Sequence, residues 1–388
     1  MKYRICIATG TRADWGIMVP LAERLRLRHD VDLQILATNM HLLETYGHTV
    51  DEIIAGGFDI SARVEIDDAN NTGGASRAVA TGQCAIGCAE AFTQLRPHAV
   101  VILGDRFEML GAATAAAIMH IPVIHLHGGE ISEGAIDDSI RHAITKLSRL
   151  HLTSTESYRR RVIQLGENPA TVINTGSLGV WNMINRPRIG RDQLLAPLGL
   201  DPGTPFAICT YHPATLDPAD PADRCNAMLD AIDRAWDGNL IISYPNNDAG
   251  SDRIITCIKA YASDRTGRVA LVKSLGMIRY MSAVHECEFV IGNSSGAIIE
   301  VPAAGKPAVN IGMRQRGRLH SPLVIDAADD TASIIQAIRT ATDINFVARA
   351  SKMPDPYYVP DAPDKAADAI MTMLHSMPLQ PKKFHDLP

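Results

Sequence analysis

Aromatic residues are scarce in this sequence, and long runs of one charge or of apolar residues are missing. Phe, Trp and Tyr make up 5% of the 388 residues, and the formal net charge is −6. An acidic balance without a Lys/Arg run argues against a nucleic-acid partner. The apolar run Tyr3–Ala8, directly after Met1-Lys2, is too short for a signal peptide or a membrane span. We therefore expect no membrane partner either.

Cysteine is also infrequent. The seven cysteines are odd in number and scattered among apolar neighbours. This distribution is typical of buried, reduced thiols and does not fit a disulfide framework or a metal knuckle. We therefore expect a cytoplasmic protein.

The sequence does contain a regular alternation of short apolar runs and segments of helix length, which is typical of a parallel α/β sheet. The runs predicted as strands in the first half are Tyr3–Ala8, Val31–Ala37, Val64–Ile66, Val100–Leu103, Ile121–Leu126, Leu150–Ser154 and Thr171–Asn174. The helices predicted between them include Ile17–Leu27, Ala75–Leu95, Ile136–Ser148 and Glu156–Leu165. The polar stretch Asp67–Gly74 is predicted to be a loop.

Four prolines between Asn185 and Pro205 predict a domain junction. The same rhythm then restarts, with strands predicted at Phe206–Tyr211, Leu240–Tyr244, Val269–Val272, Phe289–Ile291 and Ala308–Ile311. A last helix, Asp364–Leu374, precedes a tail without predicted structure. The prediction is an α/β fold with two successive parallel α/β domains and a cleft between them, at residues 1–184 and 205–360, followed by a C-terminal helix and tail at 361–388.

Ionisable residues gather after two of the predicted strands. Asp105 follows one strand, while His127 and Glu130 follow the next, and Asp137 opens the helix beyond. Because loops at the carboxyl ends of parallel strands lie at one edge of the sheet, these four side chains should converge there. They are the candidate catalytic residues.

The turn after the first predicted strand, Thr9–Asp14, contains a glycine and the guanidinium of Arg12. Backbone amides at such a turn attract anions, and arginine is a fork-shaped phosphate donor. The alternative is a simple turn in which a Thr or Asp caps the helix. The turn lacks the GxGxxG pattern of dinucleotide-binding folds.

A second candidate anion site is Gly292–Gly296, which separates a predicted strand from a helix predicted at Ala297–Ala304. Small residues let a diphosphate approach the backbone, where Ser hydroxyls and helix amides can donate. Glu300 could accept from ribose hydroxyls, and the arginines of Gly312–Arg318 could clamp the anion. A capped tight turn is the alternative.

Within Ile136–Ser148, an apolar stripe at helical spacing is predicted from Ile136, Ile140, Ala143 and Leu147. Asp137 and Arg141 could pair and face the cleft. Alternatively, acidic residues in a first turn simply oppose the helix dipole.

His125 and His127 alternate along a strand, so their side chains should share a face. With nearby carboxylates they could bind a metal, as in a His-x-His hydrolase. The remaining ligands have no clear spacing, however, and we expect no metal.

Six motifs occur in order over nearly the whole chain: TGTRADWG, LGDRFE, HLHGGE with IDDSIRHAITK, YHP, YPNNDAGSD, and GNSSG followed by Glu300. In this order and spacing the sequence resembles the hydrolysing UDP-N-acetylglucosamine 2-epimerases of sialic acid synthesis. It also resembles their relatives that act on diacetamido-trideoxyhexose nucleotides in legionaminic acid synthesis.

The resemblance implies a glycosyltransferase-B-like architecture, in which two Rossmann-like domains face a cleft and the last helix returns to the first domain. It also implies no metal or redox cofactor, and a homodimer. By motif, Asp105 and Asp137 match the family's acid/base carboxylates. The residues predicted to bind the nucleotide-sugar substrate are Arg12, Asp14, Arg106, Arg141, His142, His212, Asn247, Ser294, Ser295, Gly296, Glu300 and Arg314.

The sequence departs from the family at His127, where many members have Glu. Either His127 or Glu130 takes over that proton transfer, and imidazole suits both directions. The sugar is open between N-acetylglucosamine and the UDP- or GDP-linked diacetamido compound, with UDP-N-acetylglucosamine predicted to be moderately better. The other candidate functions are a glycosyltransferase and a non-catalytic nucleotide-sugar-binding protein.

Overall fold

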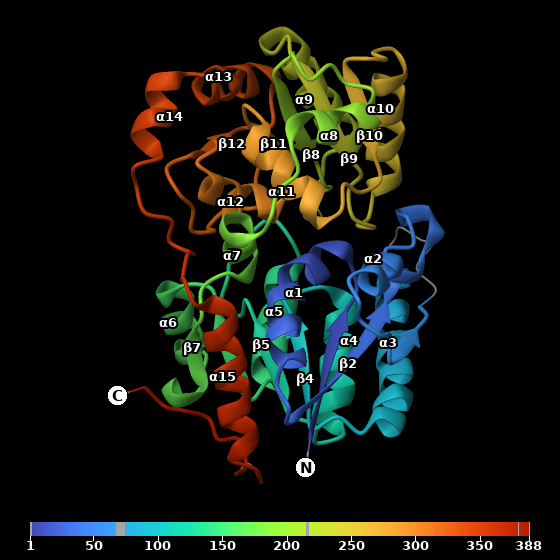
Figure 1. Cartoon of the computed structure of the whole chain (residues 1–388), viewed down its shortest axis with the longest axis vertical. Coiled ribbons are helices and arrows are strands. Elements are labelled where there is room, and N and C mark those ends of the chain that lie inside the picture. The colour runs from blue at the N-terminus through green and yellow to red at the C-terminus, as the bar shows by residue number, and fades with distance from the viewer. Residues whose placement is uncertain (1, 67–73, 215–216, 379, 388) are drawn as a thin grey trace. The chain divides into compact units, whose positions relative to one another are not determined.

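The computed structural model describes residues 2–66, 74–214, 217–378 and 380–387 (Figure 1). The predicted loop Asp67–Gly74 therefore lies almost wholly outside the described residues. The chain divides into two compact units. Unit 1 contains residues 1–130, 137–182 and 357–388, and unit 2 contains residues 131–136 and 183–356.

Within its described residues, unit 1 forms one parallel sheet of seven strands in the order β3-β2-β1-β4-β5-β6-β7. The strands are β1 (Tyr3–Thr9), β2 (Val31–Thr38), β3 (Ala62–Val64), β4 (Ala99–Leu103), β5 (Val123–Leu126), β6 (Leu150–Thr153) and β7 (Val172–Asn174). The order reverses between β1 and β4, which is where doubly wound sheets place their ligand sites. Six of the seven strands coincide with predicted ones, whereas β3 ends at Val64, the residue at which the predicted run Val64–Ile66 begins.

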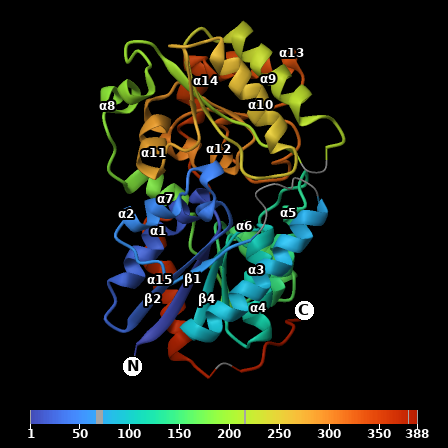
Figure 2. The same ribbon diagram turned by 90° about the vertical axis from the view of Figure 1, so that its right-hand side faces the viewer.

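Helices cover both faces of this sheet (Figure 2). They are α1 (Arg12–Arg26), α2 (Val50–Ala55), α3 (Gly74–Leu95), α4 (Phe107–Ile118), α5 (Asp137–Leu147), α6 (Glu156–Gln164), α7 (Leu178–Asn185, where unit 2 begins) and α15 (Ala362–His375). The apolar core under α3, α4 and α5 is built from β-strand and helix side chains that include Cys6, Val100 and Ile144.

The predicted apolar stripe of α5 is half right: Ile140 and Leu147 pack against the core, whereas its other two members do not. Ile136 is 49% exposed, and Ala143 is exposed as well. The buried face instead carries Arg141, Ile144 and Thr145. Hydrophobic periodicity misplaced this face because two of its buried members are polar.

Unit 2 repeats the design, with a six-stranded parallel sheet among its described residues in the order β10-β9-β8-β11-β12-β13. The strands are β8 (Phe206–Thr210), β9 (Asn239–Ser243), β10 (Val269–Val272), β11 (Val290–Gly292), β12 (Ala308–Ile311) and β13 (Val324–Ala327). The helices are α8 (Arg191–Leu195), α9 (Pro221–Ala235), α10 (Ser251–Ser263), α11 (Met277–Glu286), α12 (Ser295–Ile299), α13 (Thr331–Ala341) and α14 (Ile344–Ala350). The predictions missed β13, and the predicted helix Ala297–Ala304 is the short α12 followed by a 3-10 turn.

A short segment of the chain between β5 and α5 packs with unit 2. Residues Ile131–Ile136 belong to unit 2 by their contacts, whereas Glu130 and Asp137 belong to unit 1. The backbone amide of Glu133 donates to the carbonyl of Arg316. A Cβ on Gly134 would lie 2.5 Å from the carbonyl oxygen of Met313, so only glycine fits this approach.

The C-terminal segment returns to unit 1, as expected. Helix α15 packs on α1, with an ion pair of 2.7 Å between Arg24 and Asp364. The described residues of the tail beyond it form no helix or strand, in line with the prediction, but they are hydrogen-bonded to unit 1. Lys382 donates to the carbonyls of Lys146 and Ser148, each at 2.7 Å.

Candidate functional site

Asp105 follows β4 in a turn that Gly104 opens with a φ of +75°. Its carboxylate contacts the guanidinium of Arg141, which is 1% exposed on α5. The same guanidinium donates to the backbone carbonyl of Glu130 at 2.8 Å and to Asp138 at 3.2 Å. Arg141 therefore links the loops after β4 and β5 to the first turn of α5.

His127 and Glu130 lie in the turn after β5, and the imidazole Nδ1 is 2.9 Å from the carboxylate. Two glycines shape this turn. A Cβ on Gly128 would lie 3.1 Å from His125 Nδ1, and one on Gly129 would lie 2.6 Å from the carbonyl oxygen of Tyr158. The His-Gly-Gly-Glu sequence thus brings the turn against the start of α6.

The prediction that His125 and His127 share a strand face is wrong, because β5 ends at Leu126 and His127 has a φ of +63°. His125 Nε2 is 2.7 Å from the carbonyl of Gly104, and Nδ1 is 3.2 Å from the hydroxyl of Thr145. Burial lowers the pKa of His125 to about 3, so the ring is neutral and Nε2 carries its proton. This histidine holds the turn that precedes Asp105.

The turn after β1 is a capped helix start. Thr11 accepts a hydrogen bond from the amide of Asp14 at 3.2 Å, and the Asp14 carboxylate accepts one from the amide of Thr11 at 3.1 Å. The capped-turn interpretation is therefore confirmed for these two residues. Arg12 is the first residue of α1, and burial lowers the pKa of its guanidinium.

A buried acidic group lies beside this turn. Glu108 is fully buried and accepts from Arg106 Nε at 2.6 Å. A Cβ on Gly10 would lie 2.4 Å from the Glu108 carboxylate, which explains the glycine. Burial raises the pKa of Asp14 to about 6, against the opposing charge of Arg106.

The remaining predicted residues of unit 1 lie on α5. Asp137 is its half-buried first residue. His142 Nε2 is 3.5 Å from Asp138, and burial lowers the pKa of His142.

In unit 2, the turn after β11 is fixed by close backbone packing. Gly292 has a φ of +138°, and a Cβ there would lie 1.9 Å from the carbonyl oxygen of Thr210. The buried side chain of Asn293 accepts from the amide of His212 at 2.7 Å and donates to its carbonyl at 2.8 Å. His212 Nδ1 in turn accepts from the amide of Asn246, at 3.2 Å.

Of the three arginines predicted to clamp an anion at this turn, only one contacts it. Arg314 and Gln315 both donate to the carbonyl of Asn293, at 3.0 Å each. The other two arginines of the predicted clamp reach the segment 131–136: Arg318 donates to Ile131, and Arg316 is 3.4 Å from Glu133. Arg314 is therefore the arginine that the turn brings into the predicted anion site.

Ser294 stands at the N-cap position of α12, but its hydroxyl makes no capping hydrogen bond. Ser295 is exposed and Gly296 is half-buried beside the hydroxyl of Tyr280. Burial, and then the neighbouring Glu300 carboxylate, raise the pKa of Tyr280. Asn247 lies buried in the loop after β9.

The structure thus gathers the predicted residues into two groups, one in each unit. The sequence did not predict four buried residues whose side chains hydrogen-bond to the predicted site residues or to the turns that carry them, namely Glu108, His125, Ser154 and Asn293. Ser154 is the polar residue after β6, the same signal that identified Asp105. Asn293 lies inside the Gly292–Gly296 motif, in which only the serines were predicted to act.

Among the described parts of the chain, no group of three or more His, Cys, Asp or Glu side chains is arranged to hold a metal ion. Nor does any helix in those parts have the length and apolar character to cross a bilayer.

Two parallel, doubly wound α/β units in one chain define the glycosyltransferase-B-like class of proteins. A family model described as UDP-N-acetylglucosamine 2-epimerase matches residues 23–371. The chain belongs to this family, and the resemblance seen in its motifs is confirmed.

Three relatives illustrate the similarity. GDP/UDP-N,N'-diacetylbacillosamine 2-epimerase (hydrolyzing) of Campylobacter jejuni is 36% identical over 326 residues, 84% of each chain. The UDP-N,N'-diacetylbacillosamine 2-epimerase (hydrolyzing) of Legionella pneumophila is 36% identical over 88% of this chain and 89% of the relative. UDP-N-acetylglucosamine 2-epimerase of Neisseria meningitidis serogroup B is 30% identical over 89% of this chain and 88% of the relative.

Solved structures support the fold. The crystal structure of UDP-GlcNAc 2-epimerase from Neisseria meningitidis bound to UDP-GlcNAc has a TM-score of 0.78 at 14% identity, covering 95% of this chain and all of that one.

Proposed function

We propose that the protein is a hydrolysing 2-epimerase of a nucleotide-linked 2-acetamido sugar. The observation that carries the proposal is the group of ionisable side chains around the β4 and β5 turns, where Arg141 pairs with Asp105 and the imidazole of His127 pairs with Glu130. A sugar C2–H is barely acidic, so its loss requires bases together with a good leaving group at C1. A nucleoside diphosphate is such a leaving group.

In this reaction, anti elimination gives a glycal and the nucleoside diphosphate. Water then adds at C1 and a proton adds to the other face of C2, which inverts that centre. Asp105, Asp137 and the His127–Glu130 pair would serve the proton transfers in unit 1. In unit 2, His212, Ser294, Ser295, Glu300 and Arg314 would bind the nucleotide, where cationic and amide donors stabilise the departing diphosphate.

For the sugar, we propose the UDP-linked 2,4-diacetamido-2,4,6-trideoxyhexose. Two relatives at 36% identity carry diacetylbacillosamine in their names, which supports this choice. UDP-N-acetylglucosamine, giving N-acetylmannosamine, is the second candidate, because a relative at 30% identity is named for it. The sequence-based expectation that UDP-N-acetylglucosamine is better stays a prediction and competes with this proposal.

Comparing kcat/KM for the two nucleotide sugars decides between them. A tenfold preference corresponds to about 1.4 kcal/mol of transition-state binding. In deuterated water, the proposed reaction releases UDP and a sugar deuterated at C2. A product that keeps UDP attached to an epimerised sugar would instead indicate the non-hydrolysing reaction.

The Asp105→Asn variant separates an enzyme from a non-catalytic binding protein. We expect it to lose turnover by a factor of about 10² or more while it still binds UDP. A glycosyltransferase would transfer the sugar to an added acceptor with its gluco configuration retained, and that product would contradict the proposal.

We also propose a cytoplasmic homodimer, the state that the family resemblance implies. Val79 and Ile86 on α3 and Ile118 on α4 are each at least 60% exposed, and a second copy could cover them. Sedimentation of the Ile86→Glu variant tests this: a dimer that uses this face should dissociate.

A further inference from the structure

His127 is held in an unusual state. Its φ of +63° is a left-handed backbone conformation that few non-glycine residues adopt. The residue is 7% exposed, and its Nε2 is buried without a hydrogen-bond partner among the described residues. Such strain persists mostly at functional sites, and leaving a buried nitrogen without a hydrogen bond is unfavourable. Both features point to a ligand that meets Nε2.

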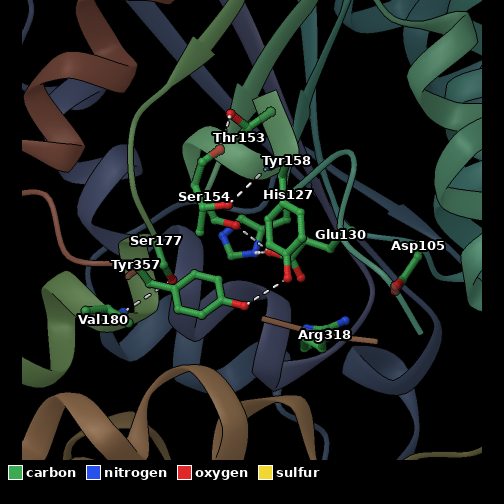
Figure 3. Close-up of polar contacts among 12 residues, drawn as sticks. Asp105, His127, Glu130, Thr153, Ser154, Tyr158, Ser177, Val180, Arg318 and Tyr357 are labelled. Carbon is green, nitrogen blue, oxygen red and sulfur yellow. Dashed lines mark hydrogen bonds and ion pairs between the residues drawn. The ribbon is translucent and has the colours of Figure 1, made fainter. Parts of the chain in front are cut away.

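The other ring nitrogen of His127, Nδ1, has a defined partner in Glu130 (Figure 3). Ser154, which is 1% exposed, places its hydroxyl 2.6 Å from Glu130 Oε1. The same oxygen is 2.9 Å from His127 Nδ1. A carboxylate only accepts hydrogen bonds, so Ser154 and Nδ1 both donate to it. Nδ1 therefore carries the proton, and Nε2 presents its lone pair.

Glu130 is also fixed at its backbone, because its carbonyl accepts from Arg141 at 2.8 Å. A glutamate that is held at its backbone carbonyl and at one carboxylate oxygen, and is only 2% exposed, is suited to orient an imidazole, as in other carboxylate–histidine pairs.

We infer that His127 Nε2 accepts the C2 proton of the sugar, while Glu130 and Ser154 are positioning residues that set the tautomer and direction of the ring. The inference rests on the proposed 2-epimerase reaction. The C2–H bond breaks as the N–H bond forms, its electrons form the C1–C2 double bond, and the C1–O electrons leave with the nucleoside diphosphate. Glu130 then lies beside the imidazolium, whose proton passes to solvent when the products depart.

The variant His127→Asn tests the catalytic atom. Asn tolerates left-handed backbone and offers an amide donor near the place of Nδ1, but it has nothing in the place of Nε2. We expect UDP to bind with unchanged affinity, kcat to fall about 10²-fold or more, and KM to change little. A variant that keeps more than a tenth of the wild-type kcat would overturn the inference.

The positioning roles have a separate readout. Glu130→Gln should lower kcat about 10-fold to 100-fold, and Ser154→Ala should lower it by less, with Ser154→Thr restoring the hydroxyl and the rate. Ser177→Ala removes another buried hydroxyl that only caps α7, so it is the matched control and should keep its kcat.

Because both groups act through one imidazole, adding Glu130→Gln to His127→Asn should cost no further activity. Multiplying effects, or a larger loss in Glu130→Gln than in His127→Asn, would assign the proton transfer to Glu130 and overturn the inference. Wild-type protein that releases no UDP from either nucleotide sugar would overturn the proposed function as well, so the two failures are distinguishable.

Discussion

At the scale of single residues, Asp14 lies in surroundings that oppose its charge. Burial raises its pKa from 3.8 to about 6, so the folded protein keeps this proton to a higher pH than the unfolded chain does. The stabilisation is complete below the unfolded value and is lost as the pH rises through about 6.

Asp14→Asn should therefore remove part of the pH dependence. At about 1.4 kcal/mol per pKa unit, the free energy of unfolding of the wild type should fall relative to Asp14→Asn by up to about 3 kcal/mol between pH 4 and pH 6.5. Urea unfolding at several pH values measures this. The exposed Asp59→Asn is the control, and an equal slope in both variants would contradict the prediction.

His125 makes a second residue-scale prediction. His125→Leu removes the donor to the Gly104 carbonyl and frees the turn that aims Asp105. Because misplacement by about 1 Å can cost up to 10² in rate, we expect kcat to fall at least tenfold with UDP affinity kept. His125→Gln, whose amide can reach the place of Nε2, should recover part of the loss. Equal rates for the two variants would rule out this role.

The sequence predicted which side chains gather at the sheet edge better than it predicted their hydrogen-bond and ion-pair partners. Asp105 and Glu130 could be predicted because polar groups after buried strands gather at one sheet edge. That Arg141 would pair with Asp105 and Asp138 could not, because it depends on how two loops and a helix start approach each other. That Asp14 binds substrate stays a prediction, whereas its part in the capping box of α1 agrees with the alternative of a capped turn.

At the scale of elements, the turn after β11 depends on Gly292. Gly292→Ala would place a methyl group 1.9 Å from the Thr210 carbonyl oxygen. The steric clash, together with the positive φ at this position, should destabilise the protein by about 2–4 kcal/mol and weaken UDP binding. Thermal unfolding and UDP titration measure both effects. Gly190→Ala has open space at the same atom and should change neither.

Strands were easier to predict than helix faces. Central strands of parallel sheets are buried on both sides and so appear as continuous apolar runs, as in β4 and β8. The missed strand β13 is a short edge strand that contains an aspartate, which weakens this signal. The face of α5 was misplaced because its buried side chains include the charged Arg141.

At the scale of the whole molecule, the tail is tied to unit 1 through a buried carboxylate. Burial would raise the pKa of Glu167, but hydrogen bonds from His151, Lys146 and Lys382 outweigh it and lower the pKa to about 2. Lys382→Ala removes one of these donors. We expect a loss of about 1–2 kcal/mol in the free energy of unfolding.

The neighbouring Lys383→Ala is exposed and serves as the matched control. Both variants should be compared by urea unfolding at neutral pH, where Glu167 is ionised in the folded protein. Equal stability of the two would contradict a bound tail.

The return of residues 357–388 to unit 1 has a consequence for how a ribosome makes this protein. Residues 1–182 emerge before residues 183–356, but the face of α1 that α15 covers stays open until residues 357–388 have been synthesised. Residues 183–356 leave the ribosome in between and can assemble their own sheet while unit 1 is still unfinished. Synthesis of unit 1 therefore begins before that of unit 2, but unit 1 is completed after it.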